Sequence, residues 1–287
     1  MICNLCPRMC SALRDEAGGC GFCGLSALPK VARIAPHMWE EPVISGKNGS
    51  GAVFFSGCTL RCVFCQNYEI SALNNGTVIT PEKLAEEFKR LDESGVHNIN
   101  LVSPTPYIEC IIEALDIYRP KIPVVYNSSG YERVESLKRL EGYVNIYLPD
   151  FKYSDDALAR EYSKAPDYVH TATEAITEML RQTGEAEFDD DGMMTSGVII
   201  RHLVLPNHTR NSIGALDIIK DRFPNTLVSL MGQYTPHGDI KKYPKLQRKI
   251  TAREYEQVRN YLFDLDLDGF AQELSSADER YIPQWDY

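Results

Sequence analysis

Three cysteines stand close together on one short stretch of the chain, Cys58, Cys62 and Cys65. Their spacing, C-x3-C-x2-C, allows three thiolates to bind one cubane iron–sulfur cluster. Simple electron carriers supply four cysteines to such a cluster, but the next cysteine in this chain is Cys110. One iron is therefore expected to be open to a small molecule, just as a catalytic zinc ion keeps one position free. An open iron indicates catalysis rather than electron storage.

A second group of cysteines lies near the N-terminus, at Cys3, Cys6, Cys10, Cys20 and Cys23. Two cysteine knuckles joined by a short loop suit a tetrahedral site of four sulfur ligands, which would hold zinc or an iron–sulfur cluster. The expected role is structural, because this segment has no core of its own. An auxiliary electron-transfer cluster is the alternative.

The composition is that of a soluble globular protein of 287 residues, 44% hydrophobic and 24% charged. A net charge of −10 disfavours nucleic acid as the main partner, since phosphate binding needs a basic face. No apolar stretch is long enough to span a membrane, and the N-terminus has no apolar segment of a secretory signal. We therefore expect a cytoplasmic protein, and in that reducing compartment clustered cysteines indicate metal binding rather than disulfides.

Short apolar runs alternate with amphipathic ones after residue 50, which predicts strands alternating with helices. The helix over 81–93 is the best marked, with Thr80 as its N-cap, Pro81 at its first position and Gly95 just past its end. The other predicted helices cover 107–118, 133–140, 155–163, 168–184, 213–223 and 251–263. The predicted strands cover 51–56, 98–102, 123–126, 144–148, 197–205 and 227–231.

This alternation predicts an α/β fold with a parallel sheet covered by helices on its outer face. Six such units are two short of a closed eight-fold barrel, so we expect a partial (β/α)6 TIM-like barrel. It would occupy residues 51–272, preceded by a cysteine-rich N-terminal extension at 1–50 and followed by a tail at 273–287.

Polar side chains follow the strands at the end where ligands bind in parallel α/β folds. The cysteine loop follows the first strand, so side chains after the other strands are expected to face it. Of the neighbours Arg201 and His202, only one can face the barrel mouth, because side chains alternate along a strand. The candidates are Ser103, Thr105, Asn127, Ser128, Asp150, Lys152, Arg201, His202, Gln233, Tyr234 and His237.

The loop Cys58-x3-Cys62-Val-Phe-Cys65, with aromatic Phe64 before the third cysteine, resembles the signature of the radical S-adenosylmethionine enzymes. Over the stretch from Cys3 to about residue 272, the chain looks like the uncharacterised branch of homologues of pyruvate formate-lyase activating enzyme. The segments that carry this closer likeness are Phe54-Phe-Ser-Gly-Cys, Tyr147-Leu-Pro-Asp-Phe-Lys-Tyr, Arg201-His-Leu-Val-Leu-Pro and Met231-Gly-Gln-Tyr-Thr-Pro.

The resemblance implies a 4Fe-4S cluster whose open iron is chelated by the methionine part of S-adenosylmethionine. One electron from the cluster would cleave this cofactor to a 5′-deoxyadenosyl radical, which abstracts a hydrogen atom. Carried over by motif, Asn127 stands near the ribose and amino acid, Lys152 matches the family's Asp-Leu-Lys, and His237 roughly matches a Tyr-His near the cofactor. Arg201 is a candidate carboxylate partner through its fork of donors.

The chain also departs from the family pattern. The Gly-Gly-Glu that binds the cofactor's amino group is replaced by Val102-Ser-Pro-Thr-Pro, so Ser103 and Thr105 stand in its place. No ferredoxin-like insert follows the first motif. At the N-terminus, Gly-Phe-Cys-Gly resembles the usual ending of the branch's cysteine segment, which favours Cys3, Cys6, Cys10 and Cys23 as ligands and leaves Cys20 extra, or alternating with Cys23.

The resemblance implies an electron donor of the flavodoxin or ferredoxin type and, as family default, the formation of a glycyl radical on a partner protein. A peptide or a small molecule remains an alternative substrate. An iron–sulfur electron-transfer or metal-binding module without radical chemistry is the alternative from another class, which the missing fourth cysteine disfavours.

Overall fold

The computed structural model describes residues 2–273 and 285–286 of the chain. Its strands are β1 (Ile2–Cys3), β2 (Ala12–Leu13), β3 (Lys30–His37), β4 (Ser50–Phe55), β5 (Thr77–Val78), β6 (Ile99–Val102), β7 (Val124–Ser128), β8 (Ile146–Pro149), β9 (Glu187–Phe188), β10 (Met194–Leu203), β11 (Leu227–Met231) and β12 (Gly269–Ala271). Its α-helices are α1 (Pro42–Ser45), α2 (Tyr68–Ser71), α3 (Pro81–Glu93), α4 (Ile108–Ile117), α5 (Val134–Leu137), α6 (Asp156–Ser163), α7 (Tyr168–Thr183), α8 (Thr209–Arg222) and α9 (Ala252–Asp264).

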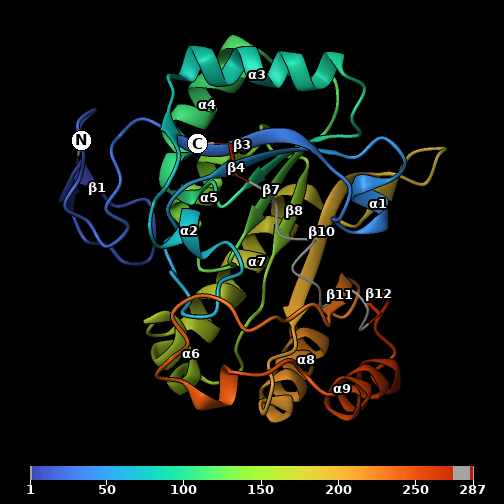
Figure 1. Cartoon of the computed structure of the whole chain (residues 1–287). Helices are drawn as coiled ribbons and strands as arrows, with labels where there is room; N and C mark the ends of the chain where they lie inside the picture. The colour runs from blue at the N-terminus through green and yellow to red at the C-terminus, as the bar shows by residue number, and fades with distance from the viewer. Residues whose placement is uncertain (1, 274–284, 287) are drawn as a thin grey trace.

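One ten-stranded sheet forms the centre of the molecule, in the order β12-β11-β10-β8-β7-β6-β4-β3-β5, with β9 paired to β10. The strands from β4 to β12 along this order run parallel, whereas β3, β5 and β9 pair antiparallel to their neighbours. The sheet curves without joining its two ends, and the longer helices lie outside it (Figure 1). The predicted α/β class is confirmed, and the open parallel sheet agrees with an incomplete barrel.

The parallel strands form here because their residues can be buried on both faces. Every residue of β4, β6, β7 and β8 is buried, as expected for strands covered by helices on one side and by the barrel interior on the other. In α3, the predicted cap is present, since the Thr80 side chain accepts a hydrogen bond from the Lys83 backbone N–H. The helix buries Leu84, Phe88 and Leu91 on one face, as the sequence pattern predicts.

Some boundaries differ from the sequence prediction. Strand β3 lies within the predicted cysteine-rich extension of residues 1–50, but it pairs with β4 over six residue pairs between Val31–Phe55 and His37–Ser50. Residues from about 30 onward therefore belong to the sheet. A short extra parallel strand, β12, follows α9, and α8 begins at Thr209 rather than at 213. The predicted tail at 273–287 falls mostly outside the described residues.

The N-terminal segment before β3 packs against the rim of the sheet instead of forming layers of its own. It contains only the small β1–β2 ladder among its described residues. Arg14, which is 2% exposed, donates hydrogen bonds from its guanidinium to the carbonyls of Leu25, Ser26 and Pro106. A buried cation thus ties this segment to the turn that follows β6. No helix among the described residues is long and apolar enough to cross a membrane.

Candidate active site

A cavity of about 310 Å³ opens at the carboxyl ends of the parallel strands. Its lining comes from the residues after or at the ends of β4, β6, β7, β8, β10 and β11. In a parallel sheet these ends meet at one edge, so side chains from remote parts of the chain converge there. The aromatic wall includes Phe54 and Phe64, and Trp285 packs edge-on against Phe54 with ring centroids 5.5 Å apart.

The cysteine loop forms one wall of this cavity, with Cys58, Cys62 and Cys65 all in the lining. Burial raises the pKa of the Cys62 thiol to about 12, with the nearby Lys152 cation partly opposing that effect. The Ser163 hydroxyl at the end of α6 donates a hydrogen bond to Cys62 Sγ at 2.9 Å, and the Leu60 N–H lies 3.4 Å from Cys58 Sγ. A thiolate here thus gains a hydrogen bond and a neighbouring cation, but burial leaves it costly unless a metal centre shares its charge.

The loop itself is held in an unusual backbone conformation. Arg61, between the first two cysteines, has a φ of 52°, in the left-handed region that side-chain-bearing residues rarely adopt. Its guanidinium donates to the Phe22 carbonyl at 2.9 Å and to the Ala72 carbonyl, and Val63 N–H donates to the Tyr162 carbonyl at 2.9 Å. The terminal segment, α2 and α6 therefore all brace the loop.

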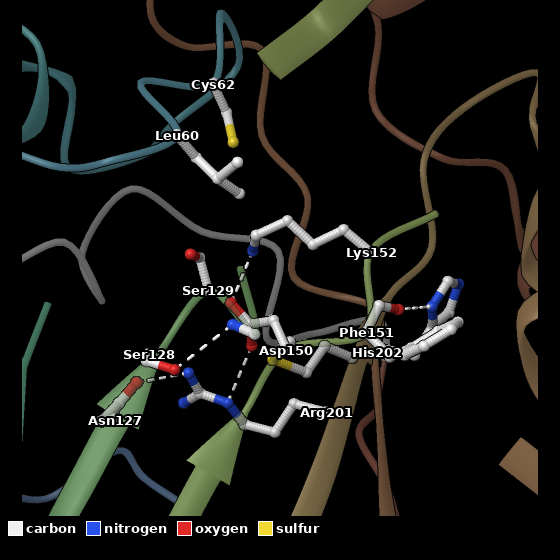
Figure 2. Close-up of polar contacts among 12 residues, drawn as sticks. Leu60, Cys62, Asn127, Ser128, Ser129, Asp150, Phe151, Lys152, Arg201 and His202 are labelled. Atoms are coloured by element: carbon white, nitrogen blue, oxygen red, sulfur yellow. Dashed lines mark hydrogen bonds and ion pairs between the residues drawn. The ribbon is translucent and has the colours of Figure 1, made fainter. Parts of the chain in front are cut away.

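A network of charged and polar side chains forms the opposite wall (Figure 2). Arg201 on β10 donates from Nε to Asp150 Oδ1 at 3.0 Å and from Nη2 to Asn127 Oδ1 at 2.5 Å. Its Nη1 donates to Glu40 Oε2 at 3.2 Å. Lys152 Nζ pairs with the second oxygen of Asp150. In Figure 2 the Lys152 amine and the Cys62 sulfur both project toward the space between the two walls.

Burial and charge pull the pKa values of this network in opposite directions. For Asp150, burial favours the neutral acid, but the cations of Arg201 and Lys152 outweigh it and lower the pKa of the carboxyl. For Glu40, burial dominates over the attraction of Arg201, so its pKa is raised. Burial lowers the pKa of Lys152, yet Asp150 and Cys62 overcome this and raise it. The cavity thus holds a charged Lys152–Asp150–Arg201 chain and one acid, Glu40, that accepts a proton readily.

Most of the predicted site residues lie in this cavity. Those in the lining are Cys58, Cys62, Phe64, Cys65, Ser103, Asn127, Ser128, Asp150, Lys152, Arg201, Gln233 and Tyr234. The alternation on β10 also holds: His202 points to the other face, where its Nδ1 lies 2.6 Å from the Phe151 carbonyl, and burial lowers its pKa to about 4 (Figure 2).

Two predicted residues are placed elsewhere. Thr105 is buried beside α4, and its hydroxyl donates to Glu132 Oε1 at 2.7 Å rather than reaching the cavity. His237 is absent from the lining, and its neighbour Gly238 packs against the Val63 carbonyl. Ser103 remains in the lining, with a φ of 59° at the turn after β6.

Glu40 is the main functional candidate that the sequence analysis missed, together with His37 and Trp39 beside it in the lining. These residues lie at the end of β3 or just after it, in the part of the chain that the sequence analysis assigned to the N-terminal extension. Their signal is weak because β3 is followed only by the single-turn helix α1 and reads as irregular chain. Only its antiparallel pairing with β4 carries Glu40 to the cavity.

The cavity suits a cluster with one open iron. Its described lining contains three cysteines and no fourth, together with cations and hydroxyls beside the sulfurs. Among the described residues, no group of three or more histidine, cysteine, aspartate or glutamate side chains has the arrangement of a bound metal ion. The three thiols share a cavity wall, and their type of donor is the one that iron–sulfur clusters use.

Comparison with known proteins points to one family. The family model described as the radical SAM superfamily matches residues 52–217, which include the cysteine loop and most of the polar wall. An uncharacterized protein of Methanocaldococcus jannaschii is 30% identical over 276 residues, covering 93% of this chain and 75% of that protein.

Solved structures agree on the fold. Methylornithine synthase (PylB) is similar at a TM-score of 0.53 and 14% identity, over 77% of this chain and 70% of that one. A radical SAM methyltransferase from Sphaerobacter thermophilus has a TM-score of 0.54 and 14% identity, over 77% of this chain and 65% of that one. At this identity the likeness concerns the arrangement of the elements.

Proposed function

The chain belongs to the radical SAM superfamily, and from this membership we propose that it is an activating enzyme that abstracts a hydrogen atom from a glycine residue of a partner protein. When bound at Cys58, Cys62 and Cys65, a 4Fe-4S cluster with S-adenosylmethionine supplies the electron and the carbon radical that such an abstraction needs. The observation that carries the proposal is the three-cysteine wall facing a buried polar network across one cavity.

The residues of the polar wall have chemistry suited to S-adenosylmethionine. Its amino acid part carries an ammonium and a carboxylate, which match the acids Glu40 and Asp150 and the cation Lys152. Asn127 and Ser128 offer an amide and a hydroxyl to the ribose. Arg201 contacts three of these groups and therefore acts by positioning them.

The size of the cavity supports a slender substrate. A volume of about 310 Å³ is at the small end of ligand pockets, which span roughly 300–1,000 Å³. The cluster, S-adenosylmethionine and the group that loses the hydrogen would all share this space. A glycine in an extended chain fits such a space better than a residue with a bulky side chain. A peptide or a small molecule with an exposed C–H is the alternative.

The first test is the cleavage reaction itself. Anaerobically reconstituted and dithionite-reduced protein mixed with S-adenosylmethionine is expected to yield 5′-deoxyadenosine, and Cys58→Ala to yield none. No product from either protein would instead favour an electron-transfer module, and equal product from both would show that Cys58 does not hold the reacting cluster.

The second test concerns the substrate. Candidate partner proteins labelled with deuterium at glycine Cα should transfer deuterium into 5′-deoxyadenosine, with the same protein carrying unlabelled glycine as control. Cleavage without transfer from any glycine-labelled protein, but with transfer from a labelled small molecule, would replace the proposed substrate.

A further inference from the structure

The cysteines of the terminal segment gather around a second, smaller cavity, separate from the active site. Cys3, Cys6, Cys10 and Cys23 all line it, together with Arg8, Arg14 and Phe22. Cys20, in contrast, is absent from the lining, although it is exposed like Cys10. The fold therefore selects four of the five cysteines.

The backbone around these cysteines is shaped to bring them together. Met9 and Ser11, on either side of Cys10, have φ values of 44° and 49°, which non-glycine residues adopt only when the surroundings enforce it. A Cβ atom at Gly21 would lie 3.1 Å from Cys10 Sγ, so the second knuckle packs its backbone directly against that sulfur. Glycine at this position permits the close approach.

Positive charge surrounds the four sulfurs. Arg14 is almost fully buried, and its Nη1 lies 3.5 Å from Cys3 Sγ. The Arg8 guanidinium stacks 3.9 Å from the centre of the Phe22 ring at the edge of the same cavity. Two cations therefore lie beside the four sulfurs, where they would partly balance the negative charge of a bound metal–thiolate centre.

We propose that Cys3, Cys6, Cys10 and Cys23 form a second metal site of four thiolates, which takes a thiophilic centre, either a zinc ion or an iron–sulfur cluster. Among the described residues, these sulfurs are not yet grouped as closely as the ligands of a bound metal ion. Metal binding would therefore draw them inward and make the segment more ordered. The site goes beyond the proposed function and needs no S-adenosylmethionine chemistry.

The site lies beside the cysteine loop of the active site, and hydrogen bonds connect the two. Arg8 Nε donates to the Thr59 carbonyl at 2.9 Å, and Thr59 follows the first cluster cysteine. Arg61 of the cysteine loop donates to the carbonyl of Phe22, next to Cys23. A metal that fixes the two knuckles therefore also braces the loop that carries Cys58, Cys62 and Cys65.

The test is metal content in a protein that cannot hold the active-site cluster. The triple variant Cys58→Ala/Cys62→Ala/Cys65→Ala, purified anaerobically, is expected to retain either about one zinc per chain or iron with acid-labile sulfide. Zinc alone identifies a mononuclear site, and iron with sulfide identifies a cluster, so both support the proposal. Adding Cys6→Ala and Cys23→Ala should remove this metal, whereas adding Cys20→Ala should leave it in place.

Retention of metal after loss of Cys6 and Cys23, loss of metal with Cys20→Ala, or no metal in the triple variant would overturn the assignment. Should the Cys6/Cys23 variant fail to fold, thiol labelling of the triple variant decides instead. Metal is expected to protect Cys3, Cys6, Cys10 and Cys23 from alkylation while Cys20 reacts, and a chelator should abolish this protection. Equal labelling with and without chelator counts against the site. Because none of these measurements uses S-adenosylmethionine, they stand apart from the test of the proposed function.

Discussion

Arg201 is the residue on which the polar wall of the active site converges. Its guanidinium binds Asp150, Asn127 and Glu40, which come from three different parts of the chain. The side chain is 12% exposed, so these contacts lie in a poorly hydrated place where an unpaired charge is costly. Arg201 thus orients three side chains relative to one another. The sequence analysis did not predict these contacts.

We expect Arg201→Met to destabilise the fold by about 3 kcal/mol, since it leaves buried acids without their cation. The lower end of the range for a broken buried pair applies because Lys152 still pairs with Asp150. Urea unfolding measures this change. The control Arg139→Met breaks an exposed pair with Glu109 and should cost less than about 1 kcal/mol. Similar losses for both variants would contradict the role given to Arg201.

Glu132 is a buried acid outside the active site that makes stability depend on pH. Burial raises its pKa from 4.5 to about 7, while hydrogen bonds from Thr105, Ser128 and Tyr126 partly oppose the shift. The folded chain therefore keeps a proton that the unfolded chain loses, and stability falls as pH rises through this window.

Replacing the acid by an amide should remove that dependence. The free energy of unfolding of the wild type is expected to fall by an amount on the order of 3 kcal/mol between pH 5 and pH 8 because of this acid. Glu132→Gln is expected to lack that fall. Urea unfolding at both pH values measures it, and Glu135→Gln, at an exposed position on α5, should follow the wild-type pH dependence. An unchanged slope in Glu132→Gln would show that this carboxyl is not the titrating group.

The cysteine loop depends on the elements packed around it more than on its own sequence. The end of α6 supplies the Ser163 hydroxyl to Cys62 Sγ, and the Tyr153 hydroxyl lies 2.6 Å from Ser163 Oγ. Hydrogen bonds to ligand sulfurs are among the factors that set the reduction potential of iron–sulfur clusters. Helix α6 is therefore expected to tune the redox centre.

Ser163→Ala should lower the midpoint potential of the reconstituted cluster, because the hydrogen bond stabilises the more negative reduced state. A bond of about 1 kcal/mol corresponds to a shift on the order of 40 mV for a one-electron couple. A redox titration followed by electron paramagnetic resonance measures it. Ser212→Ala is the matched control, since Ser212 is equally buried and its hydroxyl has no partner among the described residues. A potential that stays at the wild-type value in Ser163→Ala would argue against tuning by α6.

At the level of the whole molecule, arginine side chains join the terminal segment to the open sheet and its loops. The segment has little apolar core, and Arg14 is its most deeply buried anchor, bonded to Pro106 beyond β6. The cysteine loop receives support from the same segment through Arg8 and Arg61. Loss of the anchor should therefore release the segment while the sheet survives.

Arg14→Met is expected to make the chain before β3 susceptible to limited proteolysis, with the remainder staying resistant. Mass spectrometry of the fragments locates the cuts. Arg119→Met, which removes an exposed guanidinium that donates to the Gly142 carbonyl, should leave the wild-type pattern. Cuts spread over the sheet instead would mean that Arg14 supports the fold as a whole.

Local pattern was enough to predict the main helices, the parallel strands from β4 to β11 and the spacing of the cysteine loop. The spacing of Cys58, Cys62 and Cys65 needs only a short loop, and the capped helix α3 follows from Thr80, Pro81 and a periodic apolar face. The parallel strands could be recognised because burial on both faces leaves continuous apolar runs. Such signals lie within a few residues of one another, so a single sequence contains them.

The membership of the active site, in contrast, depends on long-range pairing. Glu40 lies in the cavity because β3 pairs antiparallel with β4. Thr105 does not line the cavity, because its hydroxyl donates a hydrogen bond to Glu132, which is distant in sequence. The sequence by itself therefore determined the spacing of the cysteine loop and the main alternation of helices and parallel strands. Only the tertiary structure decided which polar side chains face that loop, because burial and charge pairing depend on neighbours that are distant in sequence.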